Sequence, residues 1–174
     1  MEYHEPVHAQ AMGQRLTHLD EAGHARMVDV SEKSATTREA VAQADLHMLP
    51  ETLTAIREMT LRKGDVLAVA RVAAIQATKR TSELIPLCHP LALRAVEANF
   101  IEIDEKTLRI LVTVKTTGVT GVEMEALVGA TVGALTVYDM CKAIDRGMVI
   151  REACLLKKIG GKSGPYEREQ EMSR

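Results

Sequence analysis

The sequence predicts an α+β fold in which helices pack on one face of an antiparallel sheet. Several segments alternate apolar and polar residues, which is typical of strands with one buried face. Between them lie two stretches with helical spacing, one rich in Ala and one rich in Ala and Gly. The resulting order, strand, helix, strand, strand, helix, strand, is the split βαβ arrangement of ferredoxin-like folds.

The first strand and the two helices after it have clear signals. Residues 36–48 alternate, with Ala, Leu and Met on the side that we expect to be buried. Pro50 suits the first position of a short helix, which ends before the break at residues 63–64. Asp65 is a favourable N-cap for an Ala-rich helix over residues 66–79.

The next segment predicts a hairpin. Residues 93–103 alternate, but the phase slips between Phe100 and Ile101, which favours a strand carrying a bulge. A turn at residues 104–106 follows, and alternation resumes over residues 108–115.

A long helix and a closing strand complete the predicted fold. The helix spans residues 122–144, with two Glu in its first turn and Gly147 as its stop signal, and the strand spans residues 148–156. Small residues recur along one side of the helix, so it can lie flat on the sheet or on a sister helix. These small residues are Ala126, Gly129, Ala130, Gly133 and Ala134.

Charge and aromatic content exclude several classes of partner. The chain has 22 Lys+Arg and 24 Asp+Glu, a formal net charge of -2, so no global field favours nucleic acid or an anionic membrane. Three Tyr, one Phe and no Trp are too few for the stacking platforms of RNA-binding domains. The longest uncharged stretch, residues 126–138, is shorter than the roughly 20 residues of a membrane-spanning helix. We therefore expect no nucleic-acid partner and no membrane partner.

One domain accounts for most of the 174 residues. We expect a flexible N-terminal tail over residues 1–18, which holds three of the His, a single catalytic domain over residues 19–164 and a C-terminal tail over residues 165–174. The start of the chain has neither the cationic nor the apolar region of a secretory signal. The three Cys are widely spaced, as in reduced thiols, so we expect a cytoplasmic location.

Two loops have compositions that suit ligand binding. Residues 85–90, Ile-Pro-Leu-Cys-His-Pro, hold a Cys and a His between prolines that restrict the backbone, although an ordinary connector has the same features. Residues 160–164, Gly-Gly-Lys-Ser-Gly, lack the first glycine and the following helix of a P-loop. What remains is a glycine-rich turn with a lysine, which suits either phosphate contacts or a mobile turn. No Cys or His set has the spacing of a metal site, so we assign no metal ligand.

Asp139 and Lys142 lie three residues apart and therefore share a face of the long helix. Such a pair is usually a surface ion pair. An ordinary lysine, with a pKa of about 10.4, stays protonated at neutral pH. The neighbours of Lys142 are mostly apolar and are expected to exclude water from its amine, which would make the lysine a usable base or acid.

Together these segments closely resemble the molybdenum cofactor biosynthesis protein C (MoaC) family, the cyclic pyranopterin monophosphate synthases. The resemblance covers the chain from about residue 16 to residue 164. It rests on blocks that occur in the family's order. They are Met-Val-Asp-Val-Ser (27–31), Lys-Gly-Asp (63–65), Ala-Thr-Lys-Arg-Thr (77–81), Leu-Ile-Pro-Leu-Cys-His-Pro (84–90), Thr-Gly-Val-Glu-Met-Glu-Ala-Leu (120–127), Tyr-Asp-Met-Cys-Lys-Ala (138–143) and Gly-Gly-Lys-Ser-Gly (160–164).

The resemblance implies a lyase reaction. In it, (8S)-3′,8-cyclo-7,8-dihydroguanosine 5′-triphosphate becomes cyclic pyranopterin monophosphate and pyrophosphate. It also implies a homohexamer, a trimer of dimers, with sites at a subunit interface. By position in the family's blocks, the catalytic residues would be Asp139, Lys142 and Lys63. The substrate-binding residues would be Leu87, Cys88, His89, Met124 and Glu125, with Asp29, Arg38, Lys158 and Lys162 as weaker correspondences.

The residues meet the physical demands of this reaction. Rebuilding a purine-derived ring as a pterin requires proton transfers, and a lysine beside a carboxylate can provide them. Loss of pyrophosphate requires positive charge at the leaving oxygens. We expect no cofactor, and the sequence leaves the need for Mg²⁺ open. Two alternatives stay open: a ferredoxin-like module that binds a nucleotide without converting it, and, less favoured, an RNA-binding domain.

Overall fold

The computed structural model describes residue 24 and residues 27–169. The expected N-terminal tail, with His4, His8 and His18, lies outside this part of the chain. Within the described part, no helix is both long and apolar enough to cross a membrane. In chain order the elements are β1 (Thr36–His47), α1 (Pro50–Arg57), α2 (Val66–Lys79), α3 (Thr81–Leu84), β2 (Leu93–Glu102), β3 (Thr107–Gly118), α4 (Glu123–Cys141), β4 (Val149–Ile159) and β5 (Tyr166–Glu167).

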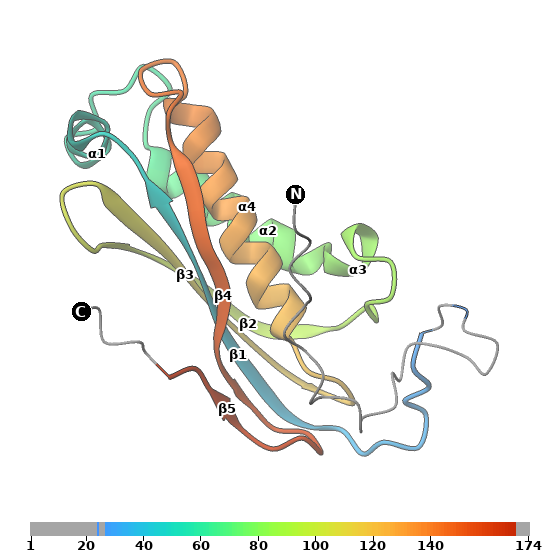
Figure 1. The fold of residues 1–174 in the computed structure, drawn as a ribbon. Helices are drawn as coiled ribbons and strands as arrows, with labels where there is room; N and C mark the ends of the chain where they lie inside the picture. Colours follow the sequence, from blue (N-terminus) through green and yellow to red (C-terminus); the bar gives the residue numbers. More distant parts are fainter. Residues whose placement is uncertain (1–23, 25–26, 170–174) are drawn as a thin grey trace, which may run out of the picture.

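The described strands form one antiparallel sheet in the order β2-β3-β1-β4-β5. Figure 1 shows α2 and α4 lying side by side across one face of this sheet. Each of these helices lies in the connection between two strands that are not hydrogen-bonded to each other. Helix α2 lies between β1 and β2, and α4 lies between β3 and β4. This is the predicted α+β, ferredoxin-like architecture.

The core lies between the sheet and the helix pair. The small side chains of β1, from Ala40 to Ala44, and the larger ones of β3, from Leu108 to Val114, point into it and are fully buried. Asp65 is the N-cap of α2, as predicted, and its carboxylate accepts a hydrogen bond of 2.9 Å from the backbone amide of Ala68.

The small-residue side of α4 is buried within the chain itself. Ala126, Ala130 and Ala134 are 0% exposed. A Cβ at Gly129 would lie 2.7 Å from a methyl of Thr78 on α2, so the absence of a side chain lets the two helices approach. Both predicted partners, sheet and sister helix, are therefore present. This side of α4 is not available for self-association.

We predict that Gly129→Ala lowers the free energy of unfolding relative to Gly133→Ala by about 1 kcal/mol. Both variants gain the same helix propensity. The Cβ at position 129 would meet Thr78 at 2.7 Å and a backbone carbonyl at 3.3 Å, whereas the nearest atom at position 133 is a methyl of Ile110 at 3.0 Å. Urea denaturation of the two variants measures the difference. Equal stabilities would show that the α2–α4 contact tolerates a methyl group at either position.

Three details differ from the sequence predictions. The bulge predicted between Phe100 and Ile101 is wrong, because β2 pairs with β3 without interruption from Ala95 to Glu102 and the irregularity lies near Leu93. The short helix α3 was not predicted. The two-residue strand β5 was not predicted either. It lies inside the segment that was expected to be a tail, and it pairs with Lys157 and Lys158 of β4.

The other face of the sheet carries ion pairs. Asp45 and Arg109 are directly opposite each other on β1 and β3, and their side chains make two hydrogen bonds of 2.7 Å. Farther along the same strands, Lys115 pairs with Glu39 at 2.8 Å. This face is therefore polar, unlike the face under the helices.

Candidate active site

A cavity of about 1120 Å³ opens at the end of the sheet where α4 begins. Segments far apart in the sequence meet there: residues 28–38, the loop at residues 87–91, the start of α4 with the residues before it at 119–125, and the end of β4 with the turn after it at 158–163. This volume is slightly above the usual range for small-molecule sites and is sufficient for a nucleotide.

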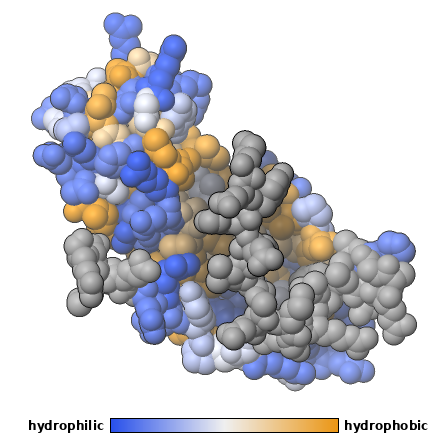
Figure 2. Space-filling model, in the orientation of Figure 1, coloured by the Kyte–Doolittle hydropathy of each residue, from blue (hydrophilic) through white to orange (hydrophobic). Residues whose placement is uncertain are grey.

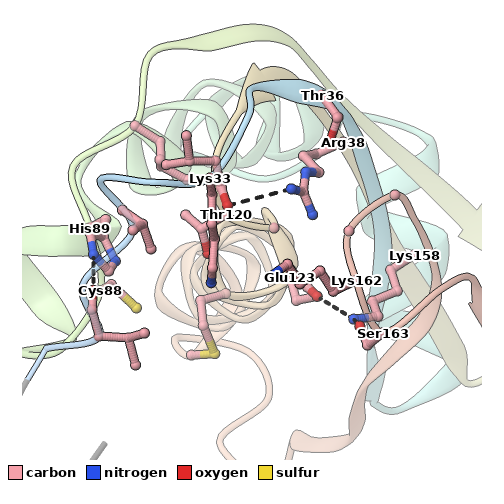
Figure 3. Close-up of a pocket in the computed structure, with 18 of the residues that line it drawn as sticks. Lys33, Thr36, Arg38, Cys88, His89, Thr120, Glu123, Lys158, Lys162 and Ser163 are labelled. Carbon is pink, nitrogen blue, oxygen red and sulfur yellow. Dashed lines mark hydrogen bonds and ion pairs between the residues drawn. The ribbon is translucent and has the colours of Figure 1, made fainter. Parts of the chain in front are cut away.

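One side of the cavity is cationic. Arg38 on β1 is buried, and its guanidinium donates hydrogen bonds to the carbonyls of Gly118 and Val119 at 3.3 and 3.4 Å. Lys158 donates to the Ser163 hydroxyl at 2.7 Å, which ties the turn after β4 to the strand. Lys162 lies on the same turn and also lines the cavity. Figure 3 shows these cations on one side of the cavity, with His89 and Cys88 on the other.

The glycines after β4 have a structural reason. Gly160 and Gly161 both have a φ near +90°, a conformation that favours glycine. A Cβ at position 160 would lie 2.3 Å from the carbonyl oxygen of Thr37, and one at position 161 would lie 2.1 Å from the Arg38 guanidinium. The glycine-rich turn therefore lets the chain pass directly against Arg38.

The opposite side of the cavity carries a histidine, a thiol and a carboxyl group. His89 Nε2 lies 2.9 Å from the carbonyl oxygen of Val28. Burial raises the pKa of the Cys88 thiol, with a smaller contribution from the charge of Glu125. Glu125 is buried in the first turn of α4, and burial raises its pKa to about 7. Near neutral pH this carboxyl can therefore either donate or accept a proton.

We predict that Glu125→Gln stabilises the protein at pH 8 by about 1 to 3 kcal/mol. The pKa of Glu125 rises from 4.5 in the unfolded chain to about 7 in the fold, so the folded state binds more protons between these values. Stability is therefore lost as pH rises from about 4.5 to 7, and the penalty persists above pH 7. Chemical denaturation at pH 4 and pH 8 measures the effect.

The control for this prediction is Glu105→Gln, at an exposed position in the β2–β3 turn, which should change stability by less than about 0.5 kcal/mol at either pH. A Glu125→Gln variant with the same stability difference from wild type at pH 4 and pH 8 would contradict the buried-carboxyl account.

The three predicted catalytic residues form a separate cluster at the other end of α4. Asp139 binds Lys142 through Oδ1 at 2.7 Å and Lys63 through Oδ2 at 3.2 Å. Lys63 also donates to the backbone carbonyl of Asp139 at 2.8 Å. Hydrogen bonds from the two lysines lower the pKa of Asp139, and the hydrogen bond to Asp139 raises the pKa of Lys142.

The expectation that apolar neighbours desolvate Lys142 is wrong for the single chain. Its side chain is 53% exposed, because Met140 and Cys141 face the core, Ala143 is itself exposed and Lys142 lies at the helix end. The carboxylate of Asp139 stabilises the ammonium form, so Lys142 is held protonated in the single chain.

The fold does not bring the two groups of predicted residues together in one chain. Fourteen positions of α4 separate Glu125 from Asp139, which is about 20 Å along the helix axis. The cavity at the start of α4 contains most of the predicted binding residues. These are Leu87, Cys88, His89, Met124, Glu125, Arg38, Lys158 and Lys162.

Asp29 differs from the other predicted binding residues, because its neighbours Val28 and Val30 line the cavity and Asp29 does not. Its carboxylate accepts hydrogen bonds from the Ser31 amide and hydroxyl at 2.9 and 2.7 Å, and these bonds lower its pKa. Asp29 therefore shapes the turn that positions its neighbours.

Sequence reasoning missed three charged residues of the cavity, which are Glu32, Lys33 and Glu123. Glu123 lies 3.1 Å from Lys158, and the sequence pattern presents it only as an acidic residue of the first helical turn. Lys33 lies on the exposed segment before β1. The sequence did carry a signal for Lys33, because this cation lies two positions after the Met-Val-Asp-Val-Ser block.

The fold and the cavity define a class of protein: a ferredoxin-like α+β protein with a nucleotide-sized pocket, cationic on one side and able to exchange protons on the other. Fold alone does not identify the chemistry, so comparison with known proteins is needed.

The comparisons agree with this class and make it specific. The model of the MoaC family matches residues 27–161. The chain is 59% identical over 155 residues to the cyclic pyranopterin monophosphate synthase of Thermoanaerobacter pseudethanolicus, covering 88% of this chain and 98% of that protein. It is 57% identical over 157 residues to the protein of the same name from Brevibacillus brevis, covering 90% of this chain and 98% of that protein. The chain belongs to the MoaC family.

Proposed function

We propose that this protein is a cyclic pyranopterin monophosphate synthase of molybdenum cofactor biosynthesis. Its substrate is 3′,8-cyclo-7,8-dihydroguanosine 5′-triphosphate, and its products are cyclic pyranopterin monophosphate and pyrophosphate. The observation that carries this proposal is the pocket itself, in which three cations, from β1, from the end of β4 and from the turn after β4, face a histidine and a buried carboxyl. Relatives at 57% to 59% identity bear the name of this activity.

The cationic side suits the triphosphate. Arg38, Lys158 and Lys162 offer charge-assisted donors to phosphate oxygens, and Arg38 is held in place before any ligand arrives. The same charges stabilise pyrophosphate as it leaves, when negative charge develops on the leaving oxygen. The ring system would then lie toward His89, Met124 and Glu125 on the opposite side.

Proton transfer is the role proposed for the Asp139 cluster. Rebuilding the purine-derived ring as a pterin moves protons to and from nitrogen and carbon centres. Lys142 is the proposed general acid, because Asp139 holds its ammonium form at 2.7 Å. Lys63 assists by binding the same carboxylate and the end of α4.

The proposed enzyme is a homohexamer, a trimer of dimers, in which the cavity of one chain meets the Asp139 cluster of another. The separation of about 20 Å within one chain supports a shared site. Large apolar side chains are exposed on the outer side of the helix layer: Val69 and Val72 of α2 and Leu135 of α4. Figure 2 shows hydrophobic surface along the course of α4. Light scattering tests the assembly, and a fully active monomer would contradict it.

No cofactor and no metal are part of the proposal. The rearrangement involves no net transfer of electrons. Arg38 and the lysines supply the positive charge that stabilises the leaving group. Turnover assays with and without Mg²⁺ and a chelator test this point. A cytoplasmic location and the absence of nucleic-acid partners stay predictions from composition and Cys spacing.

The test of the function is turnover of the cyclised nucleotide by the purified chain. We expect one pyrophosphate released for each pterin formed. Tight binding without pyrophosphate release would instead favour the alternative, a module that binds the nucleotide and leaves it unchanged.

We predict that Lys162→Ala weakens substrate binding by about 10- to 150-fold, the loss of one charge-assisted hydrogen bond. The fold should be unaffected, because Lys162 lies on an exposed turn. The matched control is Lys106→Ala, on the exposed turn between β2 and β3, which should leave the dissociation constant unchanged. Calorimetric titration with the substrate measures both variants. Equal affinity for wild type and Lys162→Ala would show that the turn does not contact the phosphates.

A further inference from the structure

A segment with no role in the proposed chemistry crosses the cavity. Residues 27–35, here called the strap, connect the His89 side of the cavity to the start of β1. In Figure 3 the backbone leading into β1 passes from the side of His89 to the side of Thr36 and Arg38. Five consecutive exposed residues of the strap begin at Ser31, and the residues that line the cavity are Val28, Val30, Glu32, Lys33 and Ser34.

The two ends of the strap are anchored very differently. Its C-terminal end continues into β1, where Thr36 pairs with Gly118 and an unbroken ladder follows. Near its N-terminal end, one hydrogen bond of 2.9 Å joins the Val28 carbonyl to His89 Nε2. Among the described residues, the Val28 end is held outside the strap by this one hydrogen bond, which is far easier to open than a ladder, so the Val28 end is the end that can be released.

The strap is locally stiff between these ends. The Ser31 amide and hydroxyl both donate to Asp29, and the Lys33 amide donates to the Val30 carbonyl at 3.0 Å. These bonds form a compact turn that places Lys33 at the cavity. Release at Val28 would therefore move the turn and Lys33 as a unit.

His89 has a defined role in this arrangement. A carbonyl oxygen can only accept a hydrogen bond, so His89 Nε2 must carry the proton. In the neutral ring, Nδ1 is then the accepting nitrogen for any ligand. His89 acts through Val28 on the strap and is in this respect a positioning residue.

Charge determines when the strap closes. Lys33 lines a cavity that also holds Arg38, Lys158 and Lys162, and the carboxylates of Glu32 and of Glu123, which pairs with Lys158, offset only part of this positive charge. The remaining like charges repel one another when no anion is bound. An anion with several phosphates can bind both sides at once and draw Lys33 inward. We propose that residues 27–35 are a ligand-responsive strap, pinned at Val28 by His89, whose Lys33 closes over the polyphosphate part of the ligand. The ligand class rests on the proposed function, whereas the pin does not.

Hydrogen–deuterium exchange of the strap amides in the full-length protein tests the pin without any ligand. In His89→Leu, exchange in the strap should be about 2- to 10-fold faster, the effect of losing one hydrogen bond. His89→Gln should restore most of the protection, because its amide can donate to the Val28 carbonyl. The matched control is His47→Leu, which loses a histidine contact to Thr107 on the sheet and should leave the strap unchanged. Equal strap exchange in wild type and His89→Leu overturns the pin.

Inorganic triphosphate, used as the probe, tests the response to ligand. It should slow exchange in the strap of wild type and of Lys106→Gln, and much less so in Lys33→Gln. Protection of residues 158–163 without protection of the strap, equal strap protection in Lys33→Gln, or no triphosphate binding at all would each overturn the ligand response. These readouts need no turnover, so a chain that fails to release pyrophosphate from the cyclised nucleotide refutes the proposed function and leaves the strap result intact.

Discussion

Lys142→Ala should release pyrophosphate about 10² to 10⁴ times more slowly than wild type, the usual cost of losing a general acid or base. Substrate affinity should stay within about tenfold, because we propose that the triphosphate binds to Arg38, Lys158 and Lys162, which line the cavity at the other end of the helix. Single-turnover kinetics with a separate binding titration distinguish the two effects.

Lys142→Arg is the discriminating companion variant. It keeps the positive charge beside Asp139, but a guanidinium does not release a proton near neutral pH. We therefore expect Lys142→Arg to be nearly as slow as Lys142→Ala. A rate close to wild type would make Lys142 an electrostatic anchor, and the proton-transfer role would then belong to Lys63 or Asp139.

Asp45→Ala should lower the free energy of unfolding by about 3 kcal/mol, because it leaves the Arg109 guanidinium without its carboxylate. The Asp45 side chain is 10% exposed and that of Arg109 is 26% exposed, so water can replace only part of the lost interaction. The hydrogen bond to Asp45 also raises the pKa of Arg109, so the guanidinium stays charged. Thermal or urea denaturation gives the value.

Two controls separate burial from ion pairing in general. Glu102→Ala breaks the pair of Arg57 with Glu102, whose side chains are 55% and 40% exposed, and should destabilise the protein far less than Asp45→Ala does. The double variant Asp45→Leu with Arg109→Met removes both charges and should recover much of the lost stability. A Glu102→Ala variant as unstable as Asp45→Ala would contradict the distinction.

The sequence predicted the fold well because the periodicities are local. Alternation in β1 and β3 and the N-cap at Asp65 depend on neighbouring residues alone, and the structure confirms them. The bulge was misplaced because the slip in phase at Phe100 reflects an edge strand with both faces partly exposed, not a change in pairing. The strand β5 depends on a partner in β4, and two residues carry no periodic signal.

The site was predictable in its residue types but not in its geometry. Motif resemblance pointed to both clusters of predicted residues, yet their separation follows only from the length and direction of α4. The exposure of Lys142 was missed because apolar neighbours in sequence lie on the other side of the helix end. The contact between Gly161 and Arg38 joins segments more than a hundred residues apart, which no local pattern reveals.

We propose that one active site combines the cavity of one chain with the Asp139 cluster of a second. Subunit exchange between His89→Ala and Lys142→Ala, each inactive alone, tests it most directly. If the two variants mix at random in dimers that contain two shared sites, about a quarter of the sites should have both native residues. Activity should then recover to about a quarter of that of wild type. If differently tagged chains demonstrably exchange and no pyrophosphate release returns, both residues act from the same chain and the shared site is wrong.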